Sequence, residues 1–430
     1  MKLSRRSILA ASGAGAIGLT AAACGSGGGG DEDAPIDLDA EATDLSGEIT
    51  LLTPDFVGDQ RPVLDNDIIA PFAEETGVKV TVDQVDWDKL NEKLTTSIAG
   101  GVIADVIMTG VGWTPPFANK GVFAQLPTDY VETLKFDETV LISAKYDDDY
   151  YSLPQGLDLR FLSYHPEFFE AAGITEPPAT IEELGQVADE LTKDGVIGFD
   201  LFSTTLRQAW IFLLYAHGGT LFSEDGLTPK LHEEPGRKAT EWILERMKNG
   251  SVDYNLQAAE GQPTPFQQKK SAIAITSTGV WPSWLDMTPE LTKEGAVGTF
   301  LMPTTDGGQL MFQGGTLISV SKRSQNQAAA IALVKHFMKP EILGIANGAT
   351  GKVPPTADIP DNEDIKSNLL ASFALENLDK AGAAEGGTAA WMEIRGNLQP
   401  LIEACLTGKS TVDQMLDEMK KLCDDAIGRL

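Results

Sequence analysis

Residues 104–110 read Ala104-Asp-Val-Ile-Met-Thr-Gly110, a short and largely apolar run that ends at glycine. Such a short apolar run next to glycine is typical of a strand buried on both faces of a sheet. Residues 49–53 and 78–82 predict two earlier strands, and apolar residues at helical spacing over 66–76 and 87–98 predict a helix after each. Strands that alternate with helices predict an α/β fold with a largely parallel sheet.

The length and charge of the chain limit its organisation and its partners. The 430 residues carry a formal net charge of −30. The part after about residue 45 is too long for one hydrophobic core, so we expect two lobes. This acidity argues against nucleic acid as a partner and against adsorption to an anionic membrane surface. The four histidines lack metal-ligand spacing, so we expect neither a metal nor a cofactor.

The first 23 residues have the features of a secretion signal. Basic residues at positions 2, 5 and 6 precede the uncharged stretch 8–23, which is rich in alanine and glycine and too short to span a membrane. Residues 1–23 are therefore predicted to be a signal peptide. The segment 4–9 (SRRSIL) is similar to a twin-arginine export signal, and the general secretory route is the alternative.

Cys24 directly follows this signal. Residues 19–24 (LTAAAC) resemble a bacterial lipobox with Cys24 as the lipidated first residue of the mature chain. Residues 25–33 (GSGGGGDED) then form a flexible, solvated tether. We therefore expect residues 24–46 to be a lipidated tether that holds the protein on the outer face of the cell membrane. A plain signal peptide that happens to contain a cysteine is the alternative.

Two other cysteines lie near the C-terminus. Cys405 and Cys423 fall in two predicted helices, about 390–406 and 412–427, one near the turn between them and one far from it. We expect two buried free thiols and no disulfide.

Ordered blocks of sequence carry a resemblance to a known family. They are 72–80 (FAEETGVKV), 104–107 (ADVI), 117–122 (FANKGV), 151–154 (YSLP), 162–165 (LSYH), 169–174 (FEAAGI), 177–180 (PPAT), 274–281 (AITSTGVW), 318–321 (ISVS) and 390–395 (AWMEIR). The chain resembles the family 1 extracellular solute-binding proteins, which include the maltose- and oligosaccharide-binding proteins of ABC importers.

The resemblance implies a two-lobed periplasmic-binding-protein-like fold (type II), with a ligand cleft between lobes joined by several hinge crossings. Residues 47–155 plus 316–355 would form lobe 1, and 156–315 plus 356–430 would form lobe 2. It implies a monomeric, non-enzymatic, extracytoplasmic protein. Such a protein captures a carbohydrate by lobe closure and delivers it to the transmembrane subunits of an ABC permease.

Tryptophans are the candidates for stacking on the apolar face of a sugar. Trp113 follows the strand 104–109, and ligands bind at such strand-end loops in open α/β sheets. A loop aromatic that only fills the edge of the lobe is the alternative. The resemblance implies that Trp281 and Trp391 also face the sugar. Trp87 and Trp242 occur at apolar helical spacing and are predicted to pack in the core. For Trp210 and Trp284 we favour a structural role over ligand contact.

Asp158 is the main polar candidate, because a carboxylate accepts hydrogen bonds from two hydroxyl groups. The resemblance places it at the first hinge as a ligand for sugar hydroxyls, with Gln155 as a further contact in the same segment. An Asp158–Arg160 pair that only braces the hinge is the alternative.

Three more polar candidates follow. The resemblance implies that Asp55, just after the first strand, contacts the ligand. Gly315 lies at the second crossing, where glycine allows the backbone to approach a ligand closely. Arg395 lies one helical turn after Trp391, so both can share a face, where Arg395 binds a hydroxyl or pairs with an acid across the cleft.

Other functions remain open at this stage. A phosphorylated polyol such as glycerol 3-phosphate could be bound through Arg160 or Arg395. A secreted glycoside hydrolase could use Asp55 and Asp158 as its carboxylate pair. A third alternative is a binding protein that serves a sensor kinase instead of a permease.

Overall fold

The computed structural model describes residue 36 and residues 45–259, 261–356 and 362–430. The predicted signal peptide 1–23, Cys24 and the tether up to residue 44, apart from Ile36, lie outside the described residues. Within these described ranges, no helix combines the length and the apolarity needed to cross a membrane.

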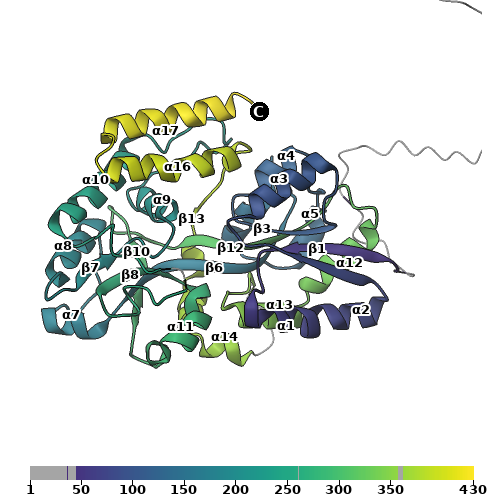
Figure 1. Ribbon diagram of the computed structural model, residues 1–430, viewed down its shortest axis with the longest axis horizontal. Coiled ribbons are helices and arrows are strands. Elements are labelled where there is room, and N and C mark those ends of the chain that lie inside the picture. Colours follow the sequence, from purple (N-terminus) through teal and green to yellow (C-terminus); the bar gives the residue numbers. More distant parts are fainter. Residues whose placement is uncertain (1–35, 37–44, 260, 357–361) are drawn as a thin grey trace, which may run out of the picture. The chain divides into compact units, whose positions relative to one another are not determined.

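One mixed sheet organises the fold (Figure 1). Its strand order is β2-β1-β3-β12-β6-β8-β7, with β13 paired to β12 and β9 paired to β6. β1 pairs in parallel with β2 and β3, and β7 with β8, whereas β3, β12, β6 and β8 pair antiparallel. The bounds are β1 (Glu48–Thr53), β2 (Lys79–Gln84), β3 (Val106–Gly110), β6 (Leu153–Tyr164), β7 (Ile197–Asp200), β8 (Ser271–Ser277), β9 (Gly298–Phe300), β12 (Phe312–Val320) and β13 (Ala383–Ala384).

The burial of the strands matches their sequences. Every residue of β3 is buried, which confirms the strand predicted from the apolar run 104–109. β8 is buried along its whole length as well. By contrast, β2 is an edge strand with exposed and half-buried residues. Two small hairpins complete the strands: β4 (Lys145–Tyr146) with β5 (Asp149–Tyr150), and β10 (Met302–Pro303) with β11 (Gln309–Leu310).

β6 and β12 form the middle of the sheet and link its two ends. They pair antiparallel from Phe312↔Arg160 to Ile318↔Leu153, with a bulge between Thr316 and Leu317. Gly315 sits beside this bulge with φ +122°. A Cβ on Gly315 would come within 2.2 Å of the carbonyl oxygen of Gly156, so only glycine fits where the two strands cross.

Helices cover the sheet on both sides. The helices within residues 61–141 and 327–376 are α1 (Arg61–Val63), the π-helical η2 (Leu64–Ile69), α2 (Ala70–Thr76), α3 (Leu90–Gly100), α4 (Thr114–Asn119), α5 (Thr128–Thr133), α6 (Glu138–Leu141), α12 (Gln327–Phe337), α13 (Pro340–Thr350), α14 (Glu363–Ser367) and α15 (Leu369–Glu376). Those within residues 166–287 and 391–427 are α7 (Pro166–Ala172), α8 (Ile181–Leu191), α9 (Leu206–Ala216), α10 (Glu234–Asn249), α11 (Trp281–Met287), α16 (Trp391–Leu406) and α17 (Val412–Ile427). α16 and α17 lie together above α9 and α10 (Figure 1).

Local signals set several helix ends. The predicted cap of α8 is confirmed, because the Thr180 side chain accepts a hydrogen bond from the Glu183 N–H. α2 and α10 end at Gly77 and Gly250, both in the left-handed conformation. α3 begins at Leu90, so Trp87 precedes the helix instead of lying on its apolar face.

Apolar side chains form three buried clusters. The largest gathers residues from β1, β3 and β12 and from α12, α13 and α15, and the second centres on α9, α10, α16 and α17. A small third cluster includes Trp113 and Phe117. Two residues of the expected lobe 2, Trp281 and Ile365, pack in the first cluster with residues of the expected lobe 1. The boundaries 47–155, 156–315, 316–355 and 356–430 remain a prediction.

Candidate functional site

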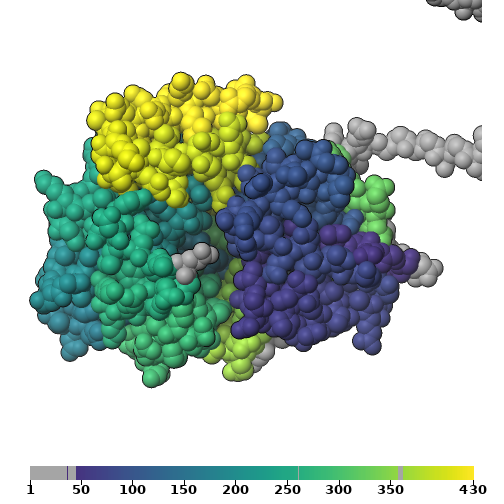
Figure 2. Space-filling view, in the orientation of Figure 1, coloured from purple at the N-terminus to yellow at the C-terminus, as the bar shows by residue number. Residues whose placement is uncertain are grey.

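A cavity of about 270 Å³ lies where distant parts of the chain meet. The N-terminal part contributes Trp87, Gly110, Val111 and Trp113. The start of α9 contributes Thr205, Arg207 and Gln208, and the crossing strands contribute Asp158, Arg160 and Gln313–Gly315. Lys352, Glu385 and Arg395 complete the lining. Figure 2 shows the N-terminal segment (purple and blue) and the middle segment (teal) meeting along a groove below the C-terminal helices (yellow).

Two indole rings form the aromatic part of the cavity. Both pack over Gly110, where a Cβ would come within 3.1 Å of Trp113 Nε1 and 3.2 Å of Trp87 Cζ3. Trp113 is 1% exposed and stacks on Phe117, with 6.0 Å between ring centroids. Trp87 is 38% exposed. The ring of Trp87 is therefore the aromatic surface most open to a ligand.

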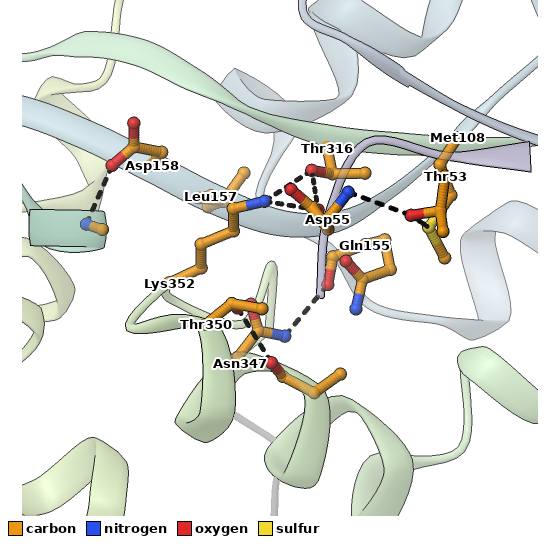
Figure 3. A network of polar contacts seen from close by, with 12 residues as sticks. Thr53, Asp55, Met108, Gln155, Leu157, Asp158, Thr316, Asn347, Thr350 and Lys352 are labelled. Carbon is orange, nitrogen blue, oxygen red and sulfur yellow. Dashed lines mark hydrogen bonds and ion pairs between the residues drawn. The ribbon is translucent and has the colours of Figure 1, made fainter. Parts of the chain in front are cut away.

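Asp158 lies on β6 in the crossing between the two ends of the sheet (Figure 3). Its Oδ1 accepts a hydrogen bond of 2.9 Å from the Gly279 N–H, and Oδ2 lies 3.2 Å from Arg160 Nη2. Burial alone would raise the pKa of Asp158, but Arg160, hydrogen bonds from Ser277 and Gly279, and Lys352 together lower it. The carboxylate is therefore ionised and can accept hydrogen bonds from ligand hydroxyl groups.

Lys352 lines the cavity, and a buried polar cluster holds its ammonium group (Figure 3). Its Nζ pairs with the Asp55 carboxylate and lies 2.6 Å from Thr316 Oγ1, and the Thr316 hydroxyl also donates to Asp55. The ammonium group lies 5.8 Å from the centroid of the Trp87 ring. Asp55 is 7% exposed and does not line the cavity, but it holds the ammonium group of Lys352, which does. Its contact with a ligand stays a prediction.

Two arginines share one glutamate on the opposite wall. Arg207 donates from Nε to Oε1 of Glu385 at 2.9 Å, and its Nη2 lies 2.8 Å from the same oxygen. Arg395 donates from Nε to Oε2 at 3.3 Å, and its guanidinium carbon lies 5.3 Å from the Trp113 ring centroid. Burial and the neighbouring Arg207 lower the pKa of Arg395, while Glu385 acts against that shift.

Of the residues predicted for the site, Trp113, Asp158, Gly315 and Arg395 line the cavity together. Gln155 does not line it: this residue is 2% exposed, and its backbone carbonyl accepts a hydrogen bond from Asn347. The Asp158–Arg160 pair is present, and both of its members line the cavity.

Trp281 and Trp391, which the resemblance implies face the sugar, are not among the residues that line the cavity. Trp281 is 4% exposed and packs beside Trp284, with 6.4 Å between ring centroids. Trp391 is fully buried and meets Phe222 edge to face at 6.3 Å. Each begins a helix, α11 or α16, whose apolar side is covered by the core. Their rings therefore stabilise packing, and their contact with a ligand is no more than a prediction.

Several cavity residues are not predicted by the sequence pattern. The apolar spacing of Trp87 from Leu90 predicts a core position, which is wrong because Trp87 is 38% exposed. Its place directly after the carboxyl end of β2 was the signal for a ligand-facing loop. Glu385, Arg207 and Lys352 belong to no local motif, and only the folded chain brings them together. Among the described residues, no group of three or more histidine, cysteine, aspartate or glutamate side chains could hold a metal ion.

Comparisons with known proteins match this architecture. The sequence profile of the bacterial extracellular solute-binding proteins matches residues 67–371. A diacetylchitobiose-binding protein of Streptomyces coelicolor is 26% identical over 375 residues, which cover 81% of this chain and 83% of that protein. A binding protein of Brucella abortus is 28% identical over 240 residues, 54% of this chain, and the chain spans 58% of that relative's length.

Solved structures confirm the two-lobed fold. The GacH receptor of Streptomyces glaucescens, determined without ligand and with acarbose, has a TM-score of 0.76 at 22% identity. The match covers 90% of this chain and 99% of GacH. The sugar-binding protein MalE of Xanthomonas citri has a TM-score of 0.73 at 19% identity, with 89% of this chain and 98% of MalE covered.

Proposed function

Because the chain belongs to the bacterial extracellular solute-binding proteins, we propose that it captures a carbohydrate in the cavity and delivers it to an ABC permease. The family places the protein outside the cytoplasm and makes it a binding protein. The relative from Streptomyces coelicolor binds diacetylchitobiose, and GacH was solved with acarbose. The ligands of these related proteins support a carbohydrate here.

One observation carries this proposal: a half-exposed indole and an ionised carboxylate line the same cavity. The ring of Trp87 offers a flat apolar surface for the C–H face of a pyranose. Asp158 offers acceptor oxygens for the hydroxyl rim. A neutral ligand that lacks either the apolar ring face or the hydroxyl groups would leave Trp87 or Asp158 without a contact.

We propose capture by closure about the crossing strands. β6 and β12 link the two ends of the sheet, and the bulge at Thr316 is a natural bending point. A sugar that contacts Trp87 and Arg207 at once favours the closed arrangement, and a preference of a few kcal/mol suffices for closure to dominate. The permease would then recognise and bind the closed form. Lipidation of Cys24 would keep the protein at the membrane surface.

The two enzyme and phosphate alternatives gain less support from the geometry. A glycoside hydrolase needs one carboxyl group with a raised pKa as proton donor, whereas the pKa of Asp158 is lowered. Asp55 does not reach the cavity and is already paired with Lys352. Glycerol 3-phosphate would bring a small ligand with no pyranose face for Trp87.

A thermal-shift screen of the purified protein against mono-, di- and oligosaccharides and glycerol 3-phosphate tests the proposal. We expect at least one sugar to raise the melting temperature of the protein. Chromatography after incubation should recover that sugar without hydrolysis products. Substitution of Trp87 by Ala should weaken the binding of that sugar by about tenfold, as expected for a lost stacking contact of roughly 1–1.5 kcal/mol. Hydrolysis products, or stabilisation by glycerol 3-phosphate alone, would contradict the proposal.

A further inference from the structure

The wall of the cavity that holds Glu385 carries more positive than negative charge. The Glu385 side chain is 4% exposed and pairs with both Arg207 and Arg395. Two guanidinium groups therefore share one carboxylate at a site largely removed from water. Since a buried cation without a full partner is unfavourable, this wall has room for one further negative charge.

The rest of the cavity does not supply that charge. Among the described residues that line it, four are cationic and two are anionic. Arg160 is matched by Asp158, and Lys352 by Asp55, which lies outside the lining. The excess of one positive charge thus falls on the pair Arg207 and Arg395. It stands out in a chain whose formal net charge is −30.

The guanidinium of Arg395 is also oriented for a ligand. Its hydrogen bond to the described residues runs from Nε to Glu385, which leaves the terminal nitrogens for an acceptor in the cavity. This guanidinium lies over the Trp113 ring, with its central carbon 5.3 Å from the ring centroid, a cation–π contact that helps to hold it in place. The start of α9, where the N-cap Thr205 makes no side-chain cap, opens on the same wall and adds the positive end of a helix dipole.

We propose that Arg395 and Arg207 bind a carboxylate of the ligand, so that the captured carbohydrate carries an acidic sugar such as a hexuronate. This inference rests on the proposed function and narrows it to a substrate class. A carboxylate suits the fork of a guanidinium in a bidentate pair. Its single charge matches the excess of one positive charge, whereas a phosphate dianion would leave a negative charge uncompensated.

Calorimetric titration of the purified protein tests this inference. The panel comprises glucuronate, galacturonate and mannuronate and their disaccharides, each compared with its methyl ester and with the neutral parent sugar. We expect at least one acidic sugar to bind about tenfold or more tighter than both neutral counterparts, as for a hydrogen bond to a charged group. Neutral sugars that bind as well as every acid would overturn the inference but leave carbohydrate capture intact. If no sugar of either kind binds, the proposed function fails as well.

Variants identify the groups responsible. Arg395→Gln should remove most of the preference for the acid over its ester, and Arg395→Lys should restore part of it because the charge returns without the fork. Arg237→Gln is the matched control, since Arg237 forms a surface ion pair with Asp413 and should leave the preference unchanged. A preference that survives Arg395→Gln, or a hexose 6-phosphate that binds tighter than the hexuronate, would overturn the assignment.

Discussion

At the scale of single residues, the tryptophans divide by exposure. Trp87 is 38% exposed at the cavity, whereas Trp391 is fully buried in the core. Substitution of Trp391 by Ala should therefore lower the free energy of unfolding by about 3–5 kcal/mol with little effect on the affinity of the folded protein. Trp87→Ala should do the reverse. Urea denaturation and calorimetric titration of both variants measure the contrast, and a loss of affinity confined to the Trp391 variant would favour the assignment from resemblance.

Asp158 gives the protein a defined response to acid. Because its pKa in the folded protein lies below the ordinary value of 3.8, its ionised form stabilises the fold above pH 3.8. That contribution is lost as the pH falls below 3.8 toward the lower folded-state pKa. Asp158→Asn should cost about 1–3 kcal/mol at neutral pH, and the gap to the wild type should narrow below pH 3.8. Urea unfolding at several pH values checks this; a gap that is constant with pH would contradict it.

The cavity residues show what a sequence can reveal at this scale. Trp113 and Gly315 were predictable because they lie at a strand end and at a strand crossing. Trp87 was misplaced because apolar spacing alone does not show where a helix begins. Arg207 and Glu385 could not be paired in advance, since 178 positions separate them and no motif marks either.

At the scale of elements, the crossing of β6 and β12 depends on one glycine. Gly315 has φ +122°, and a Cβ there would meet Gly156 O at 2.2 Å. Gly315→Ala should destabilise the protein by about 1–3 kcal/mol from backbone strain, with the clash added. Gly396→Ala is the control, because a Cβ at that helical glycine meets nothing within 4 Å. Thermal denaturation of both variants measures the difference, and equal melting temperatures would contradict the role given to Gly315.

The C-terminal pair of helices hides its thiols. Cys405 in α16 and Cys423 in α17 are free and buried, as expected from the sequence. Burial raises the pKa of Cys405 and raises that of Cys423 to about 12, so little thiolate forms at neutral pH. Both thiols should react with a disulfide reagent only after urea unfolds the protein. Rapid labelling of the native protein would show that α16 and α17 open more readily than their packing indicates.

The elements were predicted unevenly, for physical reasons. β3 and the cap of α8 follow from local signals, an apolar run and a threonine before glutamate. The antiparallel middle of the sheet was not predicted, because strand direction depends on partners far away in the chain. β12 returns beside β6 from more than 150 positions later.

At the scale of the whole molecule, the two sides of the cavity meet through backbone. A Cβ on Gly112 would lie 2.9 Å from the carbonyl carbon of Glu385 and 3.0 Å from Gly386 Cα. Gly112→Ala should therefore hold the sides apart and weaken ligand binding by about tenfold, as expected for a strain of roughly 1–3 kcal/mol in the closed form.

Gly121→Ala is the matched control for this change. Gly121 also has a positive φ, but a Cβ there meets nothing within 4 Å. It should share the local backbone strain and keep the affinity. Titration together with X-ray scattering, with and without ligand, measures affinity and compaction. If Gly112→Ala compacts and binds like the wild type, closure does not pass through this contact.

The first turn of α9 bears on how ligand specificity changes among related proteins. Thr205 and Gln208 face the cavity, yet they stand outside the network of ion pairs that holds Asp158, Lys352 and Glu385 in place. Substitutions at these two positions can reshape what the cavity accepts while the charged frame stays assembled. Related proteins that bind a different ligand should therefore differ in sequence first at the start of α9.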